Sequence, residues 1–308
     1  MPGHIRPGSG HWGTRAQAQN RNDTREWSLK LTAMFALPSP PSPIIFEAGP
    51  FALRYYGLFI ALGIAVATWL TARELERRGY DGELALDSLL FIVPLGFVGA
   101  RIYHVVTNWP FYADDPFPSV FAVWEGGLGI YGGVSAGFLG VLLFSWYRGI
   151  NPLVLADAAA PGVVLGQAIG RWGNYFNQEL FGRPTDLPWA IRIVPENRPA
   201  GFEDAETFHP TFLYESLWNL LVALALLWVA RRFTGSLKAG DVALLYMSLY
   251  STGRFFMELL RIDPAFIIGG VARGNLFVAV ILALGFALAL FLRHSGTGRK
   301  APGRRRVR

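Results

Sequence analysis

The chain contains no cysteine and has few charged residues for its length. With Cys 0 among 308 residues, it can form no disulfide or thiolate metal site and offers no cysteine nucleophile of its own. Charged residues make up 16% of the chain, against roughly 25% in typical soluble proteins. Hydrophobic residues reach 52%, and the mean hydropathy is +0.31. This composition excludes a water-soluble globule and indicates an integral membrane protein.

Seven apolar stretches approach the length needed to cross a bilayer as helices. A hydrocarbon core of about 30 Å requires roughly 20 apolar residues. The fourth stretch is the weakest, because Asp157 and Pro161 lie within it. The predicted fold is therefore an all-α integral membrane protein with spans at residues 51–73, 85–106, 126–147, 152–170, 209–230, 240–260 and 269–292.

The remaining segments divide the chain further. Residues 1–50 are predicted to be an N-terminal tail without a signal peptide, and a start at Met34 would make residues 1–33 an upstream extension. Residues 51–292 form the predicted membrane domain. Within it, the proline-rich residues 181–208 are predicted to be a cap outside the membrane, and residues 293–308 are a basic tail.

The basic residues predict the orientation of the spans. Cytoplasmic connectors are enriched in lysine and arginine, and the connector at 107–125 contains neither. We therefore expect the N-terminus outside and the C-terminus in the cytoplasm. The net charge of +6 then reflects topology and attraction to lipid, and no nucleic-acid partner is expected. The connectors on the predicted cytoplasmic side carry Arg77, Arg78, Arg148, Arg231, Arg232 and Lys238.

With this orientation, several ionisable residues fall in the outer half of the membrane. A charge there costs between about 3 and more than 10 kcal/mol, so such residues are paired or bind a ligand. Arg254, Glu258 and Arg261 follow an i, i+4, i+7 spacing, which predicts one shared helical face. Arginines outnumber carboxylates at this depth, which favours an anion site, most simply a lipid phosphate. Internal ion pairing and interfacial side chains are the simpler alternative. The residues concerned are Arg54, Arg101, Arg171, Arg254, Arg261, Glu215 and Glu258.

The sequence offers no pattern of metal ligands. It contains no HExxH motif and no close pair of histidines. His104 and His209 stand alone, so packing or interfacial roles are the simpler interpretation. No metal and no cofactor are predicted.

The most distinctive segment is GRWGNYFNQELFGRP at residues 170–184. Its chemistry alone is also that of a helix end followed by a turn. Together with residues 39–57, 125–133, 209–216 and 253–261, however, it resembles the prolipoprotein diacylglyceryl transferase family. The resemblance covers about residues 37–292, and the seven-helix topology of that family agrees with the orientation that the basic residues predict.

The resemblance implies a membrane enzyme of the bacterial inner membrane that catalyses the first step of lipoprotein maturation. Such an enzyme moves the diacylglyceryl group of phosphatidylglycerol to the lipobox cysteine thiol of a preprolipoprotein, forming a thioether and releasing glycerol phosphate. The absence of cysteine is consistent with this reaction, because the substrate supplies the sulfur. We also expect a gap between helices at the outer leaflet, through which the lipid enters, and a cap that binds the signal peptide.

By the same resemblance, two arginines are the principal catalytic residues. Arg171 and Arg254 match essential family arginines that would grip the phosphate or headgroup, and Arg254 could instead hold the incoming peptide. Glu258 and Arg261 match positions that orient this arginine face.

Four further positions complete the predicted site. Asn174 and Glu179 match polar signature positions suited to the glycerol hydroxyls, and Tyr56 matches a tyrosine near the lipid. Tyr131 stands where some family members carry a histidine proposed as the base. Here it could donate a hydrogen bond to phosphate or only pack between helices, so the base is left open.

Three other functions compete with this one. A transporter of anionic lipids would share intramembrane arginines, but inverted repeats and charges near the midplane would be expected. A lipid phosphatase or phosphatidyl transferase usually shows a nucleophile or a metal-binding set. A non-catalytic scaffold would not need arginines gathered at one depth.

Overall fold

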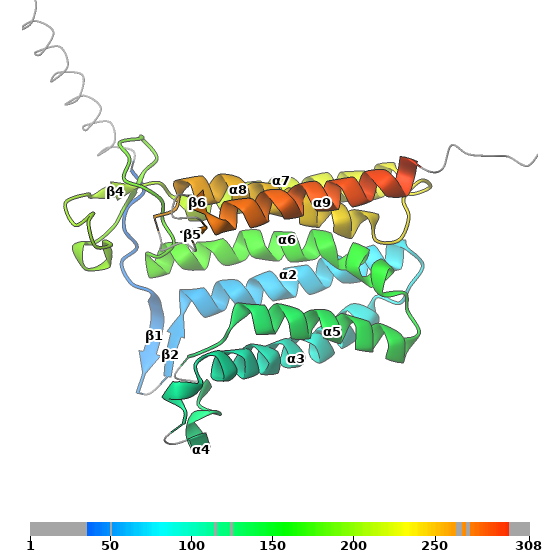
Figure 1. The fold of residues 1–308 in the computed structure, drawn as a ribbon, viewed down its shortest axis with the longest axis horizontal. Coiled ribbons are helices and arrows are strands. Elements are labelled where there is room, and N and C mark those ends of the chain that lie inside the picture. The colour runs from blue at the N-terminus through cyan, green and yellow to red at the C-terminus, as the bar shows by residue number, and fades with distance from the viewer. Residues whose placement is uncertain are drawn as a thin grey trace, which may run out of the picture.

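The computed structural model describes residues 36–49, 51–113, 116–123, 126–262, 267–268 and 272–295. The predicted seven helices are confirmed within these ranges (Figure 1). All except α8 are long and apolar enough to cross a membrane, so the chain is a multi-pass helical membrane protein. Met34 lies outside the described residues. The helices are α2 (Tyr55–Arg77), α3 (Glu83–Thr107), α5 (Ile130–Arg148), α6 (Pro152–Asn177), α7 (Thr211–Arg232), α8 (Asp241–Leu260) and α9 (Gly274–Ser295).

Short elements connect these helices. Two of them, β1 and β2, pair as an antiparallel hairpin before α2, and β3 pairs with β4 between α6 and α7. A third pair, β5 with β6, precedes α9. Their bounds are β1 (Ile44–Ala48), β2 (Phe51–Arg54), η1 (Trp109–Phe111), α4 (Pro116–Ser119), β3 (Ile191–Arg192), η3 (Pro195–Asn197), β4 (Thr207–Phe208), β5 (Ile267–Ile268) and β6 (Ala272–Arg273).

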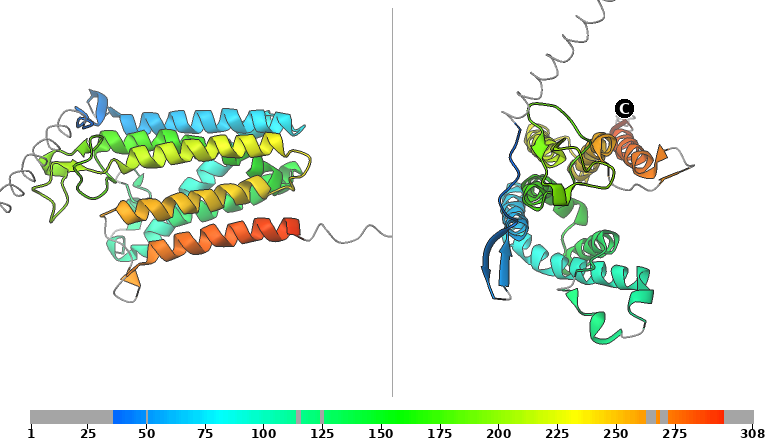
Figure 2. Two further views of the ribbon diagram at one scale, coloured as in Figure 1. Left: turned by 90° about the horizontal axis from the view of Figure 1, so that it is seen from above. Right: turned by 90° about the vertical axis from the view of Figure 1, so that its left-hand side faces the viewer.

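The long helices run side by side and alternate in direction (Figures 1 and 2). We call the end where α2 begins and α6 ends the cap end, because β3 and β4 lie there. The opposite end is the basic end. The helix-terminal arginines Arg77, Arg148 and Arg232 lie at the basic end, so the predicted grouping of basic residues is present in the fold.

Several boundaries differ from the prediction. Residues 51–54 form strand β2 instead of the first turn of a helix, because they pair with β1. The third and seventh helices also begin later than predicted, at Ile130 and Gly274. Helix α6 continues to Asn177, beyond the predicted end at residue 170. The signature segment is therefore helical over its first half.

Helices α2 and α6 pack closely through glycines. A Cβ atom added to Gly63 would lie 2.8 Å from the Gly166 carbonyl oxygen, and one added to Gly166 would lie 2.7 Å from that of Gly63. Small residues at such positions allow two membrane helices to approach backbone to backbone. This contact fixes the position of α6, which carries Arg171.

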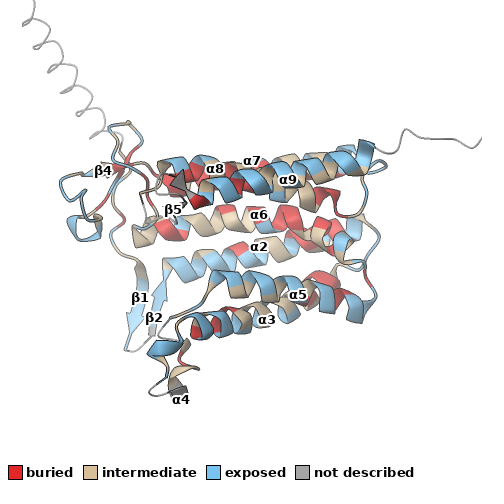
Figure 3. Cartoon of the chain, in the orientation of Figure 1, coloured by how far each residue is buried: buried red, intermediate tan, exposed pale blue. Residues whose placement is uncertain are grey.

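The α3–α5 pair is joined to the other helices at the basic end. An apolar cluster there contains Leu75 of α2, Leu84 of α3, Phe144 of α5 and Leu155 of α6. Figure 3 shows exposed residues along much of α5 and α9. Many are apolar, such as Phe138 at 65% and Leu284 at 66% exposure. Such surfaces are stable when lipid covers them.

The segment between α6 and α7 folds as a small module at the cap end, which we call the cap (residues 178–210). Phe181, Ile191 and Phe208 form its apolar centre. Leu37 joins it by a backbone bridge to Ile191, and the Tyr175 hydroxyl donates to the Pro38 carbonyl oxygen at 2.9 Å. Residues 37 and 38 are therefore held against the cap.

Candidate active site

Four charged side chains from three helices form one network near the cap end. The Arg171 Nη2 atom lies 2.6 Å from Glu215 Oε2. Arg254 lies 3.3 Å from Glu215 Oε1 through Nη1, and 3.6 Å from Glu258 Oε2 through Nη2. We call Arg171, Glu215, Arg254 and Glu258 the ion network.

The positions of these residues along their helices explain why they meet. Arg171 lies six residues before the end of α6 and Arg254 six before the end of α8, whereas Glu215 lies four after the start of α7. At 1.5 Å per residue these offsets are about 6 to 9 Å. Because α7 runs opposite to α6 and α8, the three residues share one depth.

Exposure differs between the cations and the carboxylates. The side chains of Arg171 and Arg254 are 21% and 28% exposed, whereas those of Glu215 and Glu258 are 6% and 5% exposed. The carboxylates therefore lie behind the arginines. Each guanidinium has five N–H donors, and these ion pairs engage few of them. The arrangement can accept an anion on its exposed side.

A polar contact from a fourth helix supports the buried carboxylate of Glu258. Asn275, at the start of α9, donates its amide to Glu258 Oε1 at 3.3 Å. Glu258 is thus fixed between Arg254 and Asn275, as a charge buried in a membrane requires. This contact ties α9 to the network.

The second half of the signature closes the end of α6. Glu179 Oε1 accepts hydrogen bonds from Asn174 at 2.8 Å and from Asn177 at 3.2 Å. Gln178 and Leu180 adopt positive φ angles of 51° and 56°, which turn the chain away from the helix axis into the cap. Asn174 is buried and Glu179 is exposed. The hydrogen bond between them joins the two polar signature residues that were predicted for the site.

Tyr56 lies against the signature helix. A Cβ atom added to Gly173 would lie 2.6 Å from Tyr56 Cδ2, so the glycine provides room for this ring. The neighbouring Tyr55 stacks on Phe176 with ring centroids 3.9 Å apart. The start of α2 therefore packs on the last turns of α6, with Tyr56 against Gly173.

Two arginines predicted for the cluster lie elsewhere. Arg101 donates to the backbone carbonyl oxygens of Ser119, Val120, Gly126 and Gly127 at 2.7 to 3.0 Å. Arg54 is exposed at the end of β2. Among the contacts described above, the ion network joins two arginines to two carboxylates, and the surplus of arginine at this depth stays a prediction. The outward face of the network is positive because its arginines are more exposed than its carboxylates, and not because arginines outnumber carboxylates.

Arg261 directly follows the last helical residue of α8, and its place on the face of Arg254 and Glu258 stays a prediction. Its backbone is extended, with φ −72° and ψ 148°, just after the end of α8. It forms an antiparallel backbone bridge with Gly182 of the cap. Its N–H still donates to the Met257 carbonyl oxygen at 3.2 Å, as in a helix, and the chain turns away only after it, which joins α8 to the signature segment.

Tyr131 lies on the other helix pair. It is 70% exposed in the first turn of α5, and its ring lies 5.9 Å from that of Tyr103 on α3. In the described residues no contact joins it to Arg171 or Arg254. The structure therefore brings Arg171, Arg254 and Glu258 together, with Asn174, Glu179 and Tyr56 on the adjoining turns, and leaves Tyr131 apart.

The two isolated histidines pack as predicted. His104 lies edge-on to Tyr112, with ring centroids 6.2 Å apart. His209 Nδ1 lies 3.2 Å from the Tyr214 hydroxyl, which accepts a hydrogen bond from Trp189 Nε1 at 2.8 Å. Partial burial lowers the pKa of His209 below its ordinary value. The cap is thereby held to the first turn of α7.

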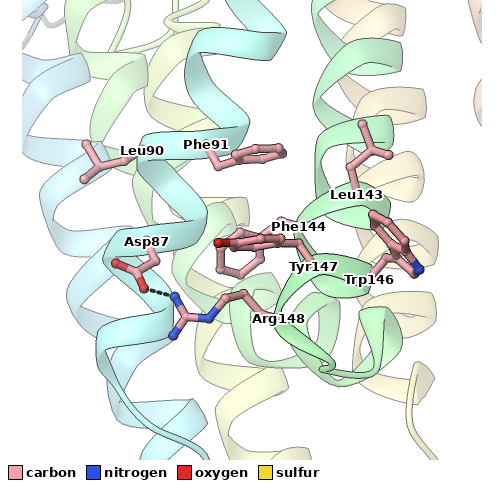
Figure 4. A pocket seen from close by; sticks show the side chains of 8 residues that line it. All are labelled: Asp87, Leu90, Phe91, Leu143, Phe144, Trp146, Tyr147 and Arg148. Carbon is pink, nitrogen blue, oxygen red and sulfur yellow. Dashed lines mark hydrogen bonds and ion pairs between the residues drawn. The ribbon is translucent and has the colours of Figure 1, made fainter.

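A hollow lies at the basic end (Figure 4). It has a volume of about 560 Å³ and is lined by aromatic and aliphatic side chains such as Phe91, Phe144 and Trp146. Arg148 of α5 pairs there with Asp87 of α3. Each of these two charges has the other as its partner, and the hollow lies at the end opposite to the ion network. We therefore do not assign the active site to this hollow.

Sequence reasoning placed Glu215 in the charged cluster without giving it a catalytic or binding role, and it did not select Asn275. Glu215 is the central acceptor of the network, and its presence as an acid within an apolar span was the available signal. Asn275 carried no comparable signal, because its role depends on how α9 packs against α8.

The fold and the network define a class of protein: a multi-pass membrane protein with a paired-arginine site set below one surface. Residues 43–291 match the family model described as prolipoprotein diacylglyceryl transferase. The chain belongs to this family.

Curated relatives agree with this assignment. The chain is 47% identical over 259 residues to a phosphatidylglycerol–prolipoprotein diacylglyceryl transferase of Frankia alni, covering 83% of this chain and 67% of the relative. It is 46% identical to the enzyme numbered 2 of Streptomyces coelicolor, covering 84% and 82%. It is 41% identical to that of Gloeobacter violaceus, covering 85% and 97%.

Proposed function

We propose that this protein transfers the diacylglyceryl group of phosphatidylglycerol to the lipobox cysteine thiol of a preprolipoprotein. The relatives are named for both substrate classes. The observation that carries the proposal is the ion network, whose guanidinium groups face outward while its carboxylates are buried behind them. This polarity suits a phosphate that enters from the lipid.

The reaction is a displacement at the glyceryl carbon that carries the phosphate. A bond forms between sulfur and this carbon, and the bond from carbon to phosphate oxygen breaks. The electron pair leaves with glycerol phosphate, and the thiol proton passes to a base or to water. Negative charge therefore grows on the phosphate, where Arg171 and Arg254 stabilise it.

Glu215 acts as a positioning residue in this scheme. It contacts both arginines, so it sets the distance between the two guanidinium groups before the lipid arrives. A preorganised pair needs no rearrangement when charge develops, which is the main advantage of an enzyme over water. Glu258 holds Arg254 from the other side, and Arg261 fixes the end of the same helix.

The remaining predicted residues complete the proposed site. Asn174 and Glu179 would bind the glycerol hydroxyls, and Tyr56 would contact the lipid beside them. Tyr131 would donate a hydrogen bond to the phosphate from the α3–α5 pair. Its exposure of 70% leaves the hydroxyl accessible, and this role requires the lipid to lie between the two helix groups.

We infer that the cap end faces outside the cytoplasm, in the inner membrane of a bacterium. The basic residues at the opposite end support this orientation. Because the chain has no cysteine, single introduced cysteines report the orientation directly. We expect a membrane-impermeant maleimide on intact spheroplasts to label Glu203→Cys in the cap and not Ser236→Cys at the basic end. The reverse pattern would refute the orientation.

Transfer itself is tested with purified protein in phosphatidylglycerol vesicles and a lipobox peptide. We expect a thioether product with cysteine at the acceptor position and none with serine. Arg171→Ala and Arg254→Ala should each lower the rate by at least about 10²-fold, while both proteins remain folded. Arg148→Ala, which removes an ion pair at the basic end, serves as the control. Near-wild-type transfer by either network variant would contradict the mechanism.

A further inference from the structure

An apolar cavity lies directly beside the proposed phosphate site. It has a volume of about 430 Å³ and lies between α2, α3 and α6. Gly170, the residue before Arg171, lines the end of the cavity nearest the cap. A Cβ atom added to Gly170 would meet nothing within 4 Å, so this end is open beside the arginine.

The length of the cavity corresponds to one lipid chain. Its lining on α6 extends from Gly170 to Ala159, and on α2 from Ile60 to Thr71. Eleven residues of helix rise about 16 Å. One leaflet is half of a hydrocarbon core of about 30 Å, so a single acyl chain has a similar reach.

A polar residue lines the cavity one turn from Arg171. Gln167 lies one turn below Arg171 and lines the cavity, and its amide donates to the Tyr246 hydroxyl of α8 at 3.0 Å. Below this contact the lining is dominated by small and aliphatic residues, including Gly63 and Ala67. A headgroup at the arginines would therefore leave a chain next to the apolar space.

The cavity also borders the lipid. Ile60 and Ile64 of α2, Val93 of α3 and Val163 of α6 line it and are 37 to 47% exposed. A chain can thus slide in from the side while its headgroup stays at the level of the arginines. Threading from the aqueous surface is not required.

We propose that this cavity holds one acyl chain of the phosphatidylglycerol donor and limits its length. The end farthest from Arg171 is formed by Thr71, Ala85, Ser88 and Ala159, where α3 meets α2 and α6 in the apolar cluster at the basic end. A chain that reaches this end meets packed side chains. This inference rests on the proposed function and adds the specificity of the same site.

The experiment compares two donors, dilauroyl and distearoyl phosphatidylglycerol, with one lipobox peptide. Ala159→Leu shortens the cavity from its far end, and Ala65→Leu on the exposed face of α2 is the matched control. We expect Ala159→Leu to lower the ratio of distearoyl to dilauroyl transfer by about tenfold, because single methylene steps in an apolar pocket discriminate at least that strongly. Ala65→Leu should leave the ratio unchanged.

An unchanged ratio in Ala159→Leu would overturn the chain-length assignment. A wild-type protein that transfers neither donor would instead overturn the proposed function. If Ala159→Leu does not fold, a distearoyl donor with a terminal diazirine tests the wild type directly. Crosslinks to residues 85–93 or 159–163 support the assignment, and crosslinks confined to other segments refute it.

Discussion

The Glu215 carboxylate lies 2.6 Å from Arg171 and 3.3 Å from Arg254, so one buried acid holds the two arginines of the network. Glu215→Gln keeps the shape and removes the charge. We expect kcat to fall by about 10²-fold, because the arginines lose their preset spacing. The KM for phosphatidylglycerol should not rise, since the site becomes more positive. Steady-state kinetics over lipid concentration measures both values.

Glu74 provides the matched control. It is also buried, and it contacts Arg77 and Arg78 at 2.8 Å each, at the basic end. Glu74→Gln should lower thermal stability without changing kcat per folded molecule. Equal loss of kcat in Glu74→Gln and Glu215→Gln would show that the effect of Glu215 is only structural.

Alanine substitutions at two glycines that lie one turn apart on α6 should have different effects on the stability of the protein. Gly166→Ala places a Cβ against the Gly63 carbonyl oxygen, and we expect it to destabilise the protein by about 1–3 kcal/mol through overpacking. Gly170→Ala meets open space and should be neutral or stabilising by up to about 1 kcal/mol, from helix propensity. Unfolding in detergent measures both, and equal destabilisation would contradict the close packing of α2 on α6.

The cap should unfold separately from the helices when its centre is emptied. Phe208 is fully buried and its ring centroid lies 4.8 Å from that of Phe181. Phe208→Ala should cost about 3–5 kcal/mol and speed hydrogen exchange in residues 181–208. Phe202→Ala, in the same segment and 36% exposed, is the control. Faster exchange throughout α2 and α6 would show instead that cap and bundle unfold together.

The lowered pKa of His209 predicts a pH dependence of stability. Burial disfavours the protonated ring in the folded state, so the unfolded chain binds more protons below its ordinary pKa of about 6.5. Stability should therefore be intact above that value and decrease as the pH falls through it. Melting temperatures between about pH 7 and 5.5 should fall more steeply for the wild type than for His209→Gln. Parallel slopes would refute the assignment.

The pH window of that experiment ends above the range in which a second group of the cap, the Glu203 carboxyl, titrates. Hydrogen bonds from the Gly201 backbone N–H lower the pKa of Glu203 from its ordinary 4.5. The carboxyl therefore stays ionised throughout the window, and its stabilising contacts are lost only at lower pH. The two groups titrate in separate ranges.

The sequence predicted the helices better than it predicted their ends. Long apolar runs are a strong signal because each must span the same hydrocarbon thickness. Residues 51–54 look equally apolar, but pairing with β1 makes them a strand. Gly170 and Gly173 favour a helix end near residue 170, yet α6 continues because Tyr55 and Tyr56 pack on its last turns.

Only part of the candidate site could be predicted from the sequence, because the sequence shows the depth of a residue better than its partners. The depth shared by Arg171, Arg254 and Glu215 follows from span positions, which the sequence shows. The partners of Arg101 do not, because its guanidinium donates to backbone carbonyl oxygens, which every residue of any sequence carries. Helix α8 ends at Leu260, so Arg261 is its flanking residue, and its backbone bridge to Gly182 of the cap could not be predicted from helical spacing.

The backbone bridge between Gly182 and Arg261 has a mechanical consequence. The Arg183 N–H also donates to the Leu260 carbonyl oxygen at 2.9 Å. The cap is therefore hydrogen-bonded to the last residue of the helix that carries Arg254. Any displacement of the cap is therefore passed to the C-terminal end of this helix through main-chain hydrogen bonds.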